Sequence, residues 1–149
     1  MYTLALVLHS WLRWVALVAG VGATFSALVD SSDGRRSDRW GLALVTSVDL
    51  QMLVGLLLYF VLSPFTAAAM RDFGAAMKDP GLRFFAVEHV TMMFAAVILV
   101  HVGRVLARKA PTPGARRTRQ FVCFGLATVL MIVAIPWPGM ANGRPLLRV

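Results

Sequence analysis

Cysteine is almost absent from this sequence. Its 149 residues include a single cysteine, Cys123, which lies within an apolar run. One cysteine cannot close an intrachain disulfide and has no second thiolate with which to hold a metal, so a disulfide scaffold and a cysteine metal site are both excluded. We expect Cys123 to be a small residue of the core.

Charged residues are also scarce. They make up 15% of the chain, hydrophobic residues make up 58%, and the mean hydropathy is +0.72. A soluble domain typically has about 25% charged and about 45–50% apolar residues. The composition therefore favours a single membrane domain that comprises residues 1–149.

Acidic residues are outnumbered, with 7 Asp and Glu against 15 Lys and Arg, which gives a formal net charge of +8. The basic residues flank apolar runs, where Lys and Arg set the orientation of membrane helices and meet anionic headgroups. We therefore expect membrane lipid as a partner and no nucleic acid.

Four apolar stretches approach the length of roughly 20 residues that crosses a hydrocarbon core of about 30 Å. The stretch at the N-terminus lacks a charged leading region and is longer than the apolar core of a signal peptide, so we expect a retained helix. The sequence predicts an all-α fold, an integral membrane four-helix bundle. The predicted spans are residues 2–29, 41–62, 84–103 and 121–135, the last of them near the lower length limit.

The connections between these spans differ in character. Residues 31–40 are polar and charged, and residues 104–120 are rich in arginine. Residues 63–83 carry Phe65, Met70, Phe73 and Met77 at helical spacing. This spacing predicts a short amphipathic helix on the membrane surface between the second and third spans. The segment after Pro136 is rich in proline and glycine, and we expect it to be irregular.

Seven polar side chains within or close to the spans are informative, because ionisable groups in a membrane are costly and usually line a site or pair with one another. Two histidines have similar depth. His9 lies seven residues into the first span and His89 five residues into the third, or about 10 Å and 8 Å from the same membrane face at the helical rise. The seven residues are His9, Arg13, Asp49, Gln51, Glu88, His89 and His101.

Two imidazoles at one level of a helix bundle can occupy both axial positions of one haem iron. The first and third spans run in the same direction, so His9 and His89 are predicted to ligate a haem b. Arg13, and Arg83 at the outer interface, are candidates to neutralise the propionates. Residues on the same helix faces are predicted to line the cofactor: Arg13, Ala16 and Gly20 beside His9, and Met92, Met93 and Ala96 beside His89.

A structural role is the alternative for these residues. A histidine in a membrane helix can hydrogen-bond a neighbouring helix without binding a cofactor. Glu88, which is next to His89 in the sequence, and Arg13 can form a buried ion pair.

His101 lies twelve residues after His89, which places it about 18 Å deeper. It therefore cannot share a small site with His89. Its depth is similar to that of Asp49, and we expect a hydrogen bond between the two. His101, Asp49 and Gln51 are the candidates for a second polar site, which would be a redox or proton site.

The stretches "LHSWLRWVALVAGVGATF" and "EHVTMMFAAVILVHVGR" resemble a superfamily of membrane proteins that includes HemJ-type protoporphyrinogen oxidases, the CopD copper-resistance domain and the membrane domain of some urate oxidases. The resemblance covers the first and third spans, with His9, Trp14, Gly20 and Gly22 in one and His89 and His101 in the other. It implies a four-helix haem-binding protein. His89 stands where the HemJ-type pattern has lysine, which argues against the oxidase activity and for two histidine ligands.

The blocks "LHSWLRW", "VEH" and "IPWP" are similar to a family of small bacterial membrane proteins, which implies the bacterial inner (cytoplasmic) membrane as the location. Three functions stay open. The first is electron transfer by a b-type haem protein, with a quinone or larger membrane subunits as partners. The second is a cofactor-free accessory or structural subunit of a membrane complex. The third is a HemJ-like enzyme of haem metabolism.

The orientation is the first testable prediction. The first and third connections carry nine basic residues and the opposite side carries five, so the positive-inside rule places both termini outside. An alkaline phosphatase reporter fused after Val149 should be active, and a cytoplasm-dependent fluorescent reporter at the same place should be dark. The reverse result would overturn this topology. The nine are Arg35, Arg36, Arg39, Arg104, Arg108, Lys109, Arg116, Arg117 and Arg119; the five are Arg71, Lys78, Arg83, Arg144 and Arg148.

Overall fold

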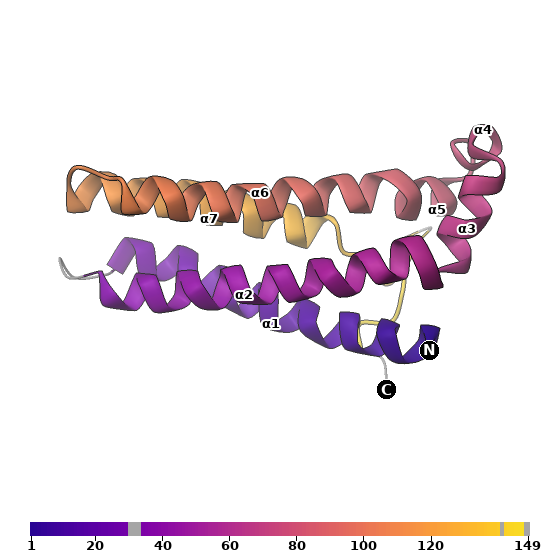
Figure 1. Cartoon of the computed structure of the whole chain (residues 1–149), viewed down its shortest axis with the longest axis horizontal. Coiled ribbons are helices and arrows are strands. Elements are labelled where there is room, and N and C mark those ends of the chain that lie inside the picture. Colours follow the sequence, from indigo (N-terminus) through magenta and orange to yellow (C-terminus); the bar gives the residue numbers. More distant parts are fainter. Residues whose placement is uncertain (30–33, 141, 148–149) are drawn as a thin grey trace.

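Helices make up nearly all of the computed structural model, which describes residues 1–29, 34–140 and 142–147, and no strand occurs among these residues. Four long helices run along one axis (Figure 1). They are α1 (Tyr2–Val29), α2 (Arg35–Leu57), α6 (His89–Arg108) and α7 (Pro113–Val133). Two π-helical segments adjoin them: η1 (Leu58–Leu62) continues α2, and η2 (Phe84–Glu88) leads into α6.

The order of packing decides which side chains can meet. Helix α1 packs against α2 and α7, and α6 packs against α7 and, less extensively, against α2. Helices α1 and α6 therefore lie diagonally opposite each other and run in the same direction (Figure 1). Any group that α1 and α6 share lies in the middle of the bundle.

Small residues form much of the core, while large apolar residues face outward. Alanines such as Ala16, Ala23, Ala96 and Ala127 are buried, and Phe124 is the largest side chain that is fully buried. Small residues let helix backbones approach closely, as they do between membrane helices. Exposed apolar residues cover the outer faces, among them Val18, Val21, Phe25, Leu53, Phe94, Ile98, Val129 and Val133.

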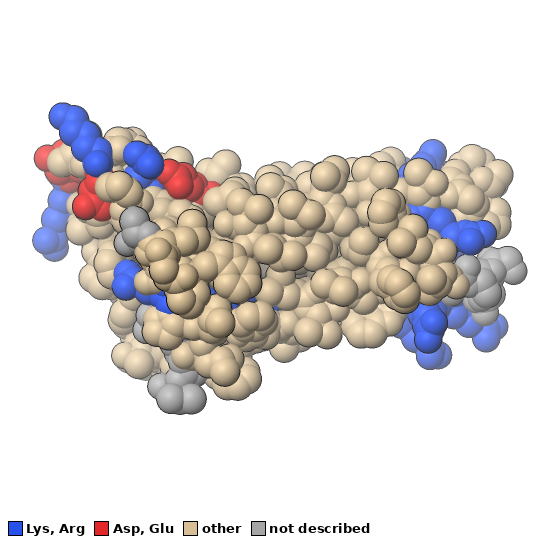
Figure 2. Space-filling model, turned by 180° about the vertical axis from the view of Figure 1, so that it is seen from behind, with Lys and Arg blue, Asp and Glu red and all other residues tan. Residues whose placement is uncertain are grey.

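Three helical stretches are long and apolar enough to cross a membrane: Tyr2–Val29, Arg35–Leu62 and Pro80–Arg108. The fourth long helix, α7, has Arg116, Arg117 and Arg119 near its start, which shortens its apolar part. On the face that Figure 2 shows, most charged side chains gather toward the two ends, with a wide uncharged band between them. This distribution fits a multi-pass membrane protein.

The helices extend beyond the predicted spans. Helix α2 begins at Arg35 rather than at residue 41, and α7 begins at Pro113 rather than at residue 121 and ends at Val133. Helix α6 continues to Arg108, so only residues 109–112 connect it to α7. Thr112 caps α7 by accepting a hydrogen bond from the Ala115 N–H at 3.1 Å, and Pro113 suits the first helical turn. Of the predicted connection 31–40, residues 31–33 lie outside the described residues.

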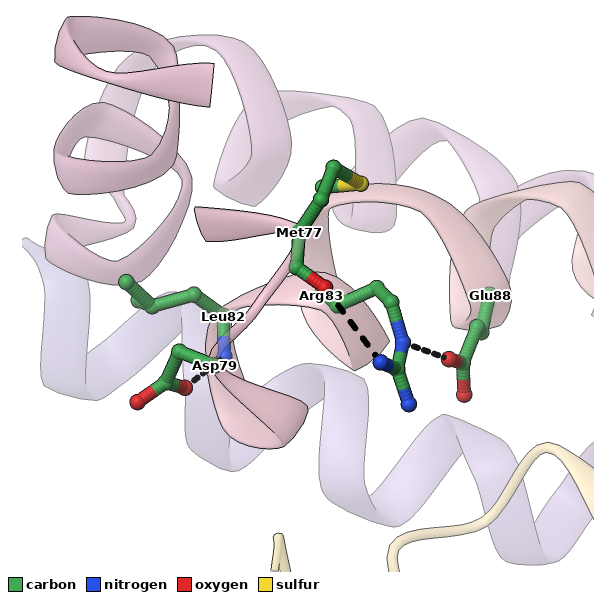
Figure 3. Close-up of polar contacts among 5 residues, drawn as sticks. All are labelled: Met77, Asp79, Leu82, Arg83 and Glu88. Atoms are coloured by element: carbon green, nitrogen blue, oxygen red, sulfur yellow. Dashed lines mark hydrogen bonds and ion pairs between the residues drawn. The ribbon is translucent and has the colours of Figure 1, made fainter. Parts of the chain in front are cut away.

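The single amphipathic helix predicted for residues 63–83 is wrong. Three short helices occupy this segment: α3 (Pro64–Arg71), α4 (Phe73–Ala76) and α5 (Pro80–Arg83). Asp72 and Asp79 interrupt the helical path, because each carboxylate accepts a backbone N–H three residues later. Asp72 accepts from Ala75 at 2.9 Å. Asp79 accepts from Leu82 at 2.7 Å (Figure 3). Such caps start new helices. After α7, residues 134–140 and 142–147 contain no helix, as expected for the segment after Pro136, and the chain returns toward α1 (Figure 1).

Cys123 is buried, as predicted, at the place where α6 and α7 approach most closely. A Cβ atom on Gly103 would lie 2.5 Å from the Cβ of Cys123. In contrast, a Cβ atom on Gly125 would lie in ordinary contact, 3.5 Å from Thr24.

Gly103→Ala is therefore expected to destabilise the protein. Overpacking costs about 1–3 kcal/mol, which exceeds the gain of about 1 kcal/mol from the helix propensity of alanine. A thermal unfolding curve in detergent should show a lower midpoint for Gly103→Ala and an unchanged or higher midpoint for the control Gly125→Ala. Equal midpoints for the two variants would contradict the close approach of α6 and α7.

Candidate functional site

His9 and His89 face each other across the diagonal of the bundle. The centroids of their rings are 6.3 Å apart, and the ring planes make an angle of 65°. His9 comes from the first third of α1, and His89 is the first residue of α6 after the π-helical segment η2. The predicted match in depth between the two histidines is therefore present, and their rotations about the helix axes also bring them together.

Nδ1 of each histidine faces the backbone of another segment: the end of α7 for His89, and α2 for His9. Nδ1 of His89 lies 2.8 Å from the carbonyl oxygen of Ala134, to which it can donate. The Nδ1–Cε1 edge of His9 faces Gly55 on α2, where a Cβ atom would lie 3.2 Å from Cε1. Nδ1 of His9 is buried and has no hydrogen-bond partner among the described residues. The Nε2 atoms of both rings are thus free of these backbone contacts.

A cavity of about 170 Å³ contains both imidazoles. Its wall is largely apolar, with a few polar groups that converge on the interior, as is common in binding sites. Gln51 is one of these, and its Oε1 atom is buried without a partner. The residues that matter for the site are His9, Ser10, Arg13, Ala16, Gln51, Met52, Gly55, Tyr59, Phe65, Phe85, His89, Met93, Ala96 and Arg144.

Both π-helical segments border this cavity. Tyr59, in η1, donates from its hydroxyl to the carbonyl of Ala86, in η2, at 2.8 Å. The wider turn of η2 ends at His89, whose N–H donates to the Phe84 carbonyl. Segments of π-helix are frequent at functional sites because they change the direction of the side chains that follow. Here such a segment directly precedes one of the two histidines.

Two arginines line the cavity, one of them from the C-terminal segment, residues 134–147. The guanidinium of Arg144 lies over the rings of Phe65 and Phe85, 4.5 Å and 5.3 Å from their centroids. Its backbone N–H donates to Pro136 at 2.9 Å. Arg13 donates to Ser10 and to the carbonyl of Leu146. The C-terminal segment therefore brings a second cation to the cavity.

Three residues predicted to be at this site are elsewhere. Gly20 is buried against α7, where its Cβ would lie 2.6 Å from the hydroxyl of Thr128, and Met92 does not line the cavity. Arg83 donates to Glu88 at 2.6 Å and to the Met77 carbonyl at 3.3 Å (Figure 3). The alternative pairing of Glu88 with Arg13 is therefore wrong, and Arg144 takes the place that Arg83 was predicted to have. Ala16, Met93 and Ala96 do line the cavity.

The second polar site is present in part. Nε2 of His101 lies 2.9 Å from Oδ1 of Asp49, as predicted. Gln51 does not belong to this pair, because it lines the cavity of His9 and His89 instead. The helical period explains the difference: Asp49 and Gln51 are two positions apart and point to different faces of α2.

The sequence held weak signals for the residues that were missed. Gln51 and Gly55 are four positions apart, so they share the face of α2 that meets His9. Nothing in the sequence pairs Arg144 with Phe65 and Phe85, because an irregular segment has no period from which to predict its contacts.

Comparison with known protein families, with curated proteins and with solved structures finds no match to this chain.

The contacts of Arg144 make a prediction about the C-terminal segment. A cation over aromatic rings contributes about 0.5–1 kcal/mol at an exposed site, so Arg144→Gln should raise the open population of this segment roughly two- to fivefold. Limited proteolysis with chymotrypsin in detergent, followed by mass spectrometry, should show faster cleavage after Met140. Arg71→Gln, which changes an exposed arginine of α3, is the control. Equal cleavage rates for the two variants would contradict the role of Arg144.

Proposed function

We propose that the protein crosses the membrane four times and holds a b-type haem between His9 and His89 for electron transfer. The separation of the two imidazoles is the observation that carries this proposal. A bond from a metal to an imidazole nitrogen is about 2.0–2.1 Å long, and the nitrogen is about 1.1 Å from the ring centroid, so two imidazoles on opposite sides of one ion have centroids about 6.3 Å apart. The observed centroid distance is 6.3 Å.

The number of ligands also favours a haem over a bare ion. Among the described residues, no group of three or more His, Cys, Asp and Glu side chains is arranged to hold a metal. Two axial histidines are sufficient when a macrocycle supplies the other donors. The contact between Nδ1 of His89 and a backbone carbonyl is the arrangement that fixes the tautomer of a ligating histidine.

The residues around the histidines fit an anionic, flat cofactor. Arg13 and Arg144 line the cavity and are the groups that would neutralise two propionates. Phe65, Phe85 and Ala96 offer apolar surface. A macrocycle is larger than the present cavity, so holding it requires flexible side chains such as Met52 and Met93, on α2 and α6, to move aside. When bound, a haem supplies one-electron redox chemistry.

The wider setting stays a prediction: the inner membrane of a bacterium, both termini outside, and a quinone or larger membrane subunits as redox partners. The chain's own part in it would be to hold the cofactor with His9 and His89 and to keep water away from it through the apolar wall of the cavity. The shortness of α7 is compatible with a fourth crossing, because Arg116, Arg117 and Arg119 can extend toward the headgroups.

Haem retention tests the proposal. Purified protein, reconstituted with haemin if necessary, should show sharp absorption bands of a low-spin b-type haem on reduction. His9→Ala and His89→Ala should each abolish or greatly reduce haem retention, whereas the control His101→Ala should leave it unchanged. Added imidazole should restore part of the low-spin spectrum in the two alanine variants, because it replaces the missing ligand.

Three results would contradict the proposal. Full haem occupancy in both ligand variants would remove His9 and His89 as ligands. Loss of haem only in His101→Ala would mean that the wrong histidine of the third span was assigned. Featureless visible absorption of the reconstituted protein would favour the cofactor-free accessory subunit.

A further inference from the structure

Asp49 and His101 form a polar pair on an outer face of the molecule. Their side chains are 45% and 49% exposed, although they bond each other at 2.9 Å. Asp49 lies nine residues after Trp40, or about 14 Å along α2 at the helical rise. On α2 the pair therefore lies well inside the apolar part of the helix, and on α6 it lies one helical turn before Arg104.

Apolar side chains surround the pair above and below. Positions 94, 98, 101 and 105 share one face of α6, and positions 42, 46, 49 and 53 share one face of α2. The exposed apolar residues on these two faces are Leu42, Leu53, Phe94, Ile98 and Val105. Together with Asp49 and His101 they make up the α2/α6 stripe.

The pair is not satisfied by its single bond. A carboxylate has about four acceptor positions, and an imidazole has two nitrogens. Within the described part of the chain, the bond between Nε2 and Oδ1 is the one hydrogen bond recorded for either side chain. Oδ2 of Asp49 and Nδ1 of His101 therefore remain available. Ionisable groups in membrane spans almost always face a protein interior or a water-filled cavity. We therefore expect another molecule to contact this half-exposed pair and shield it from lipid.

We propose that a second copy of this chain covers the α2/α6 stripe, in a dimer with two-fold symmetry. In the ion-paired form of the pair, an imidazolium beside a carboxylate, each copy presents one available acceptor, Oδ2 of Asp49, and one available donor, Nδ1–H of His101, side by side. A two-fold axis that passes near the pair brings the donor of one copy to the acceptor of the other, twice. The stripe is thus complementary to itself, and lipid chains offer no hydrogen bond in exchange.

The other outer faces lack this feature. On α1, the outward residues Val15, Val18 and Val21 are apolar, and so are Leu126 and Val129 on α7. Those faces suit lipid as they are. A small lipid-soluble ligand such as a quinone could bond the pair, but it would use only a small part of the stripe.

Cysteine cross-linking in native membranes tests which face lies between the copies. In a Cys123→Ala background, single cysteines are placed on the stripe at Leu53, Phe94, Ile98 and Val105, because a disulfide reaches only short Cα–Cα distances. Val18 and Val129 are matched controls, since Val18, Val129 and Ile98 are 62%, 55% and 59% exposed. Oxidation should give dimers from one or more stripe positions and not from the controls. Equal cross-linking at the controls, or none on the stripe, would overturn the proposal.

The contribution of Asp49 and His101 to the stability of the dimer is tested by a second measurement. Asp49→Leu with His101→Leu removes both partners, so neither is left with an unmet charge, and the bundle should still fold. Hydrogen bonds between membrane helices contribute about 0.6–1.7 kcal/mol each, so losing two should weaken the dimer roughly tenfold to a few hundredfold. Energy transfer between labelled copies at increasing lipid dilution measures this change. Thr118→Leu, which changes an exposed polar residue of α7, should leave the equilibrium unchanged.

Each other outcome counts against the dimer. Wild-type protein that is monomeric at every lipid ratio would overturn it, and so would a double variant that dimerises as tightly as the wild type. Photolabelling of monomers by an azido-ubiquinone, lost in the double variant, would assign the pair to a small ligand instead. These readouts need no haem, so failure of the proposed function would leave this test intact.

Discussion

Close packing of small residues along α1, α6 and α7 is the constraint on which the rest of the structure depends. Ala16, Ala23 and Ala127 are buried where these helices meet, and Gly103 allows α6 to approach Cys123. Helices that approach in this way hold α1 and α6 at a fixed diagonal distance, with no direct packing between them. His9 and His89 are large polar side chains placed across that diagonal, near the end of the bundle at which α1 and α6 begin. The distance between their rings is therefore set by backbone packing at other levels and not by a contact between the two rings.

The fold was largely predictable from the apolar runs, because each run of about 20 apolar residues has few alternatives to a helix. The ends of the helices were not. Helix α2 includes Arg35, Arg36 and Arg39, and α7 includes Arg116, Arg117 and Arg119, because helix propensity and capping continue the backbone beyond the apolar part. Hydropathy reports where a chain is apolar, whereas the caps at Thr112, Asp72 and Asp79 decide where helices begin.

The depth of the site residues along their helices was predictable from the sequence, whereas the direction in which each side chain points was less so. The helical rise placed His9 and His89 at one level, and the period correctly placed Ala16, Met93 and Ala96 on the cavity wall. The prediction for Gly20 was wrong although Gly20 shares the helix face of His9, since eleven residues at 100° each leave the two only 20° apart. The cavity ends before the depth of Gly20, and α7 fills the space there. The prediction for Arg83 was wrong for a different reason: its guanidinium forms an ion pair with Glu88, which is nearer. Arg144 was beyond prediction, since its position depends on a segment with no regular structure.

The polar residues of the long helices divide into two groups by the direction they face. His9, Arg13, Gln51 and His89 face a common interior, where the buried Oε1 of Gln51 has no hydrogen-bond partner among the described residues. A site that is complete without a ligand would leave few such atoms, because each costs free energy. Asp49 and His101 face outward, where their remaining hydrogen-bonding positions need a partner from another molecule. The same physical cost, that of an unmet polar group in apolar surroundings, thus supports the proposed cofactor inside the bundle and the proposed second copy on its outer face.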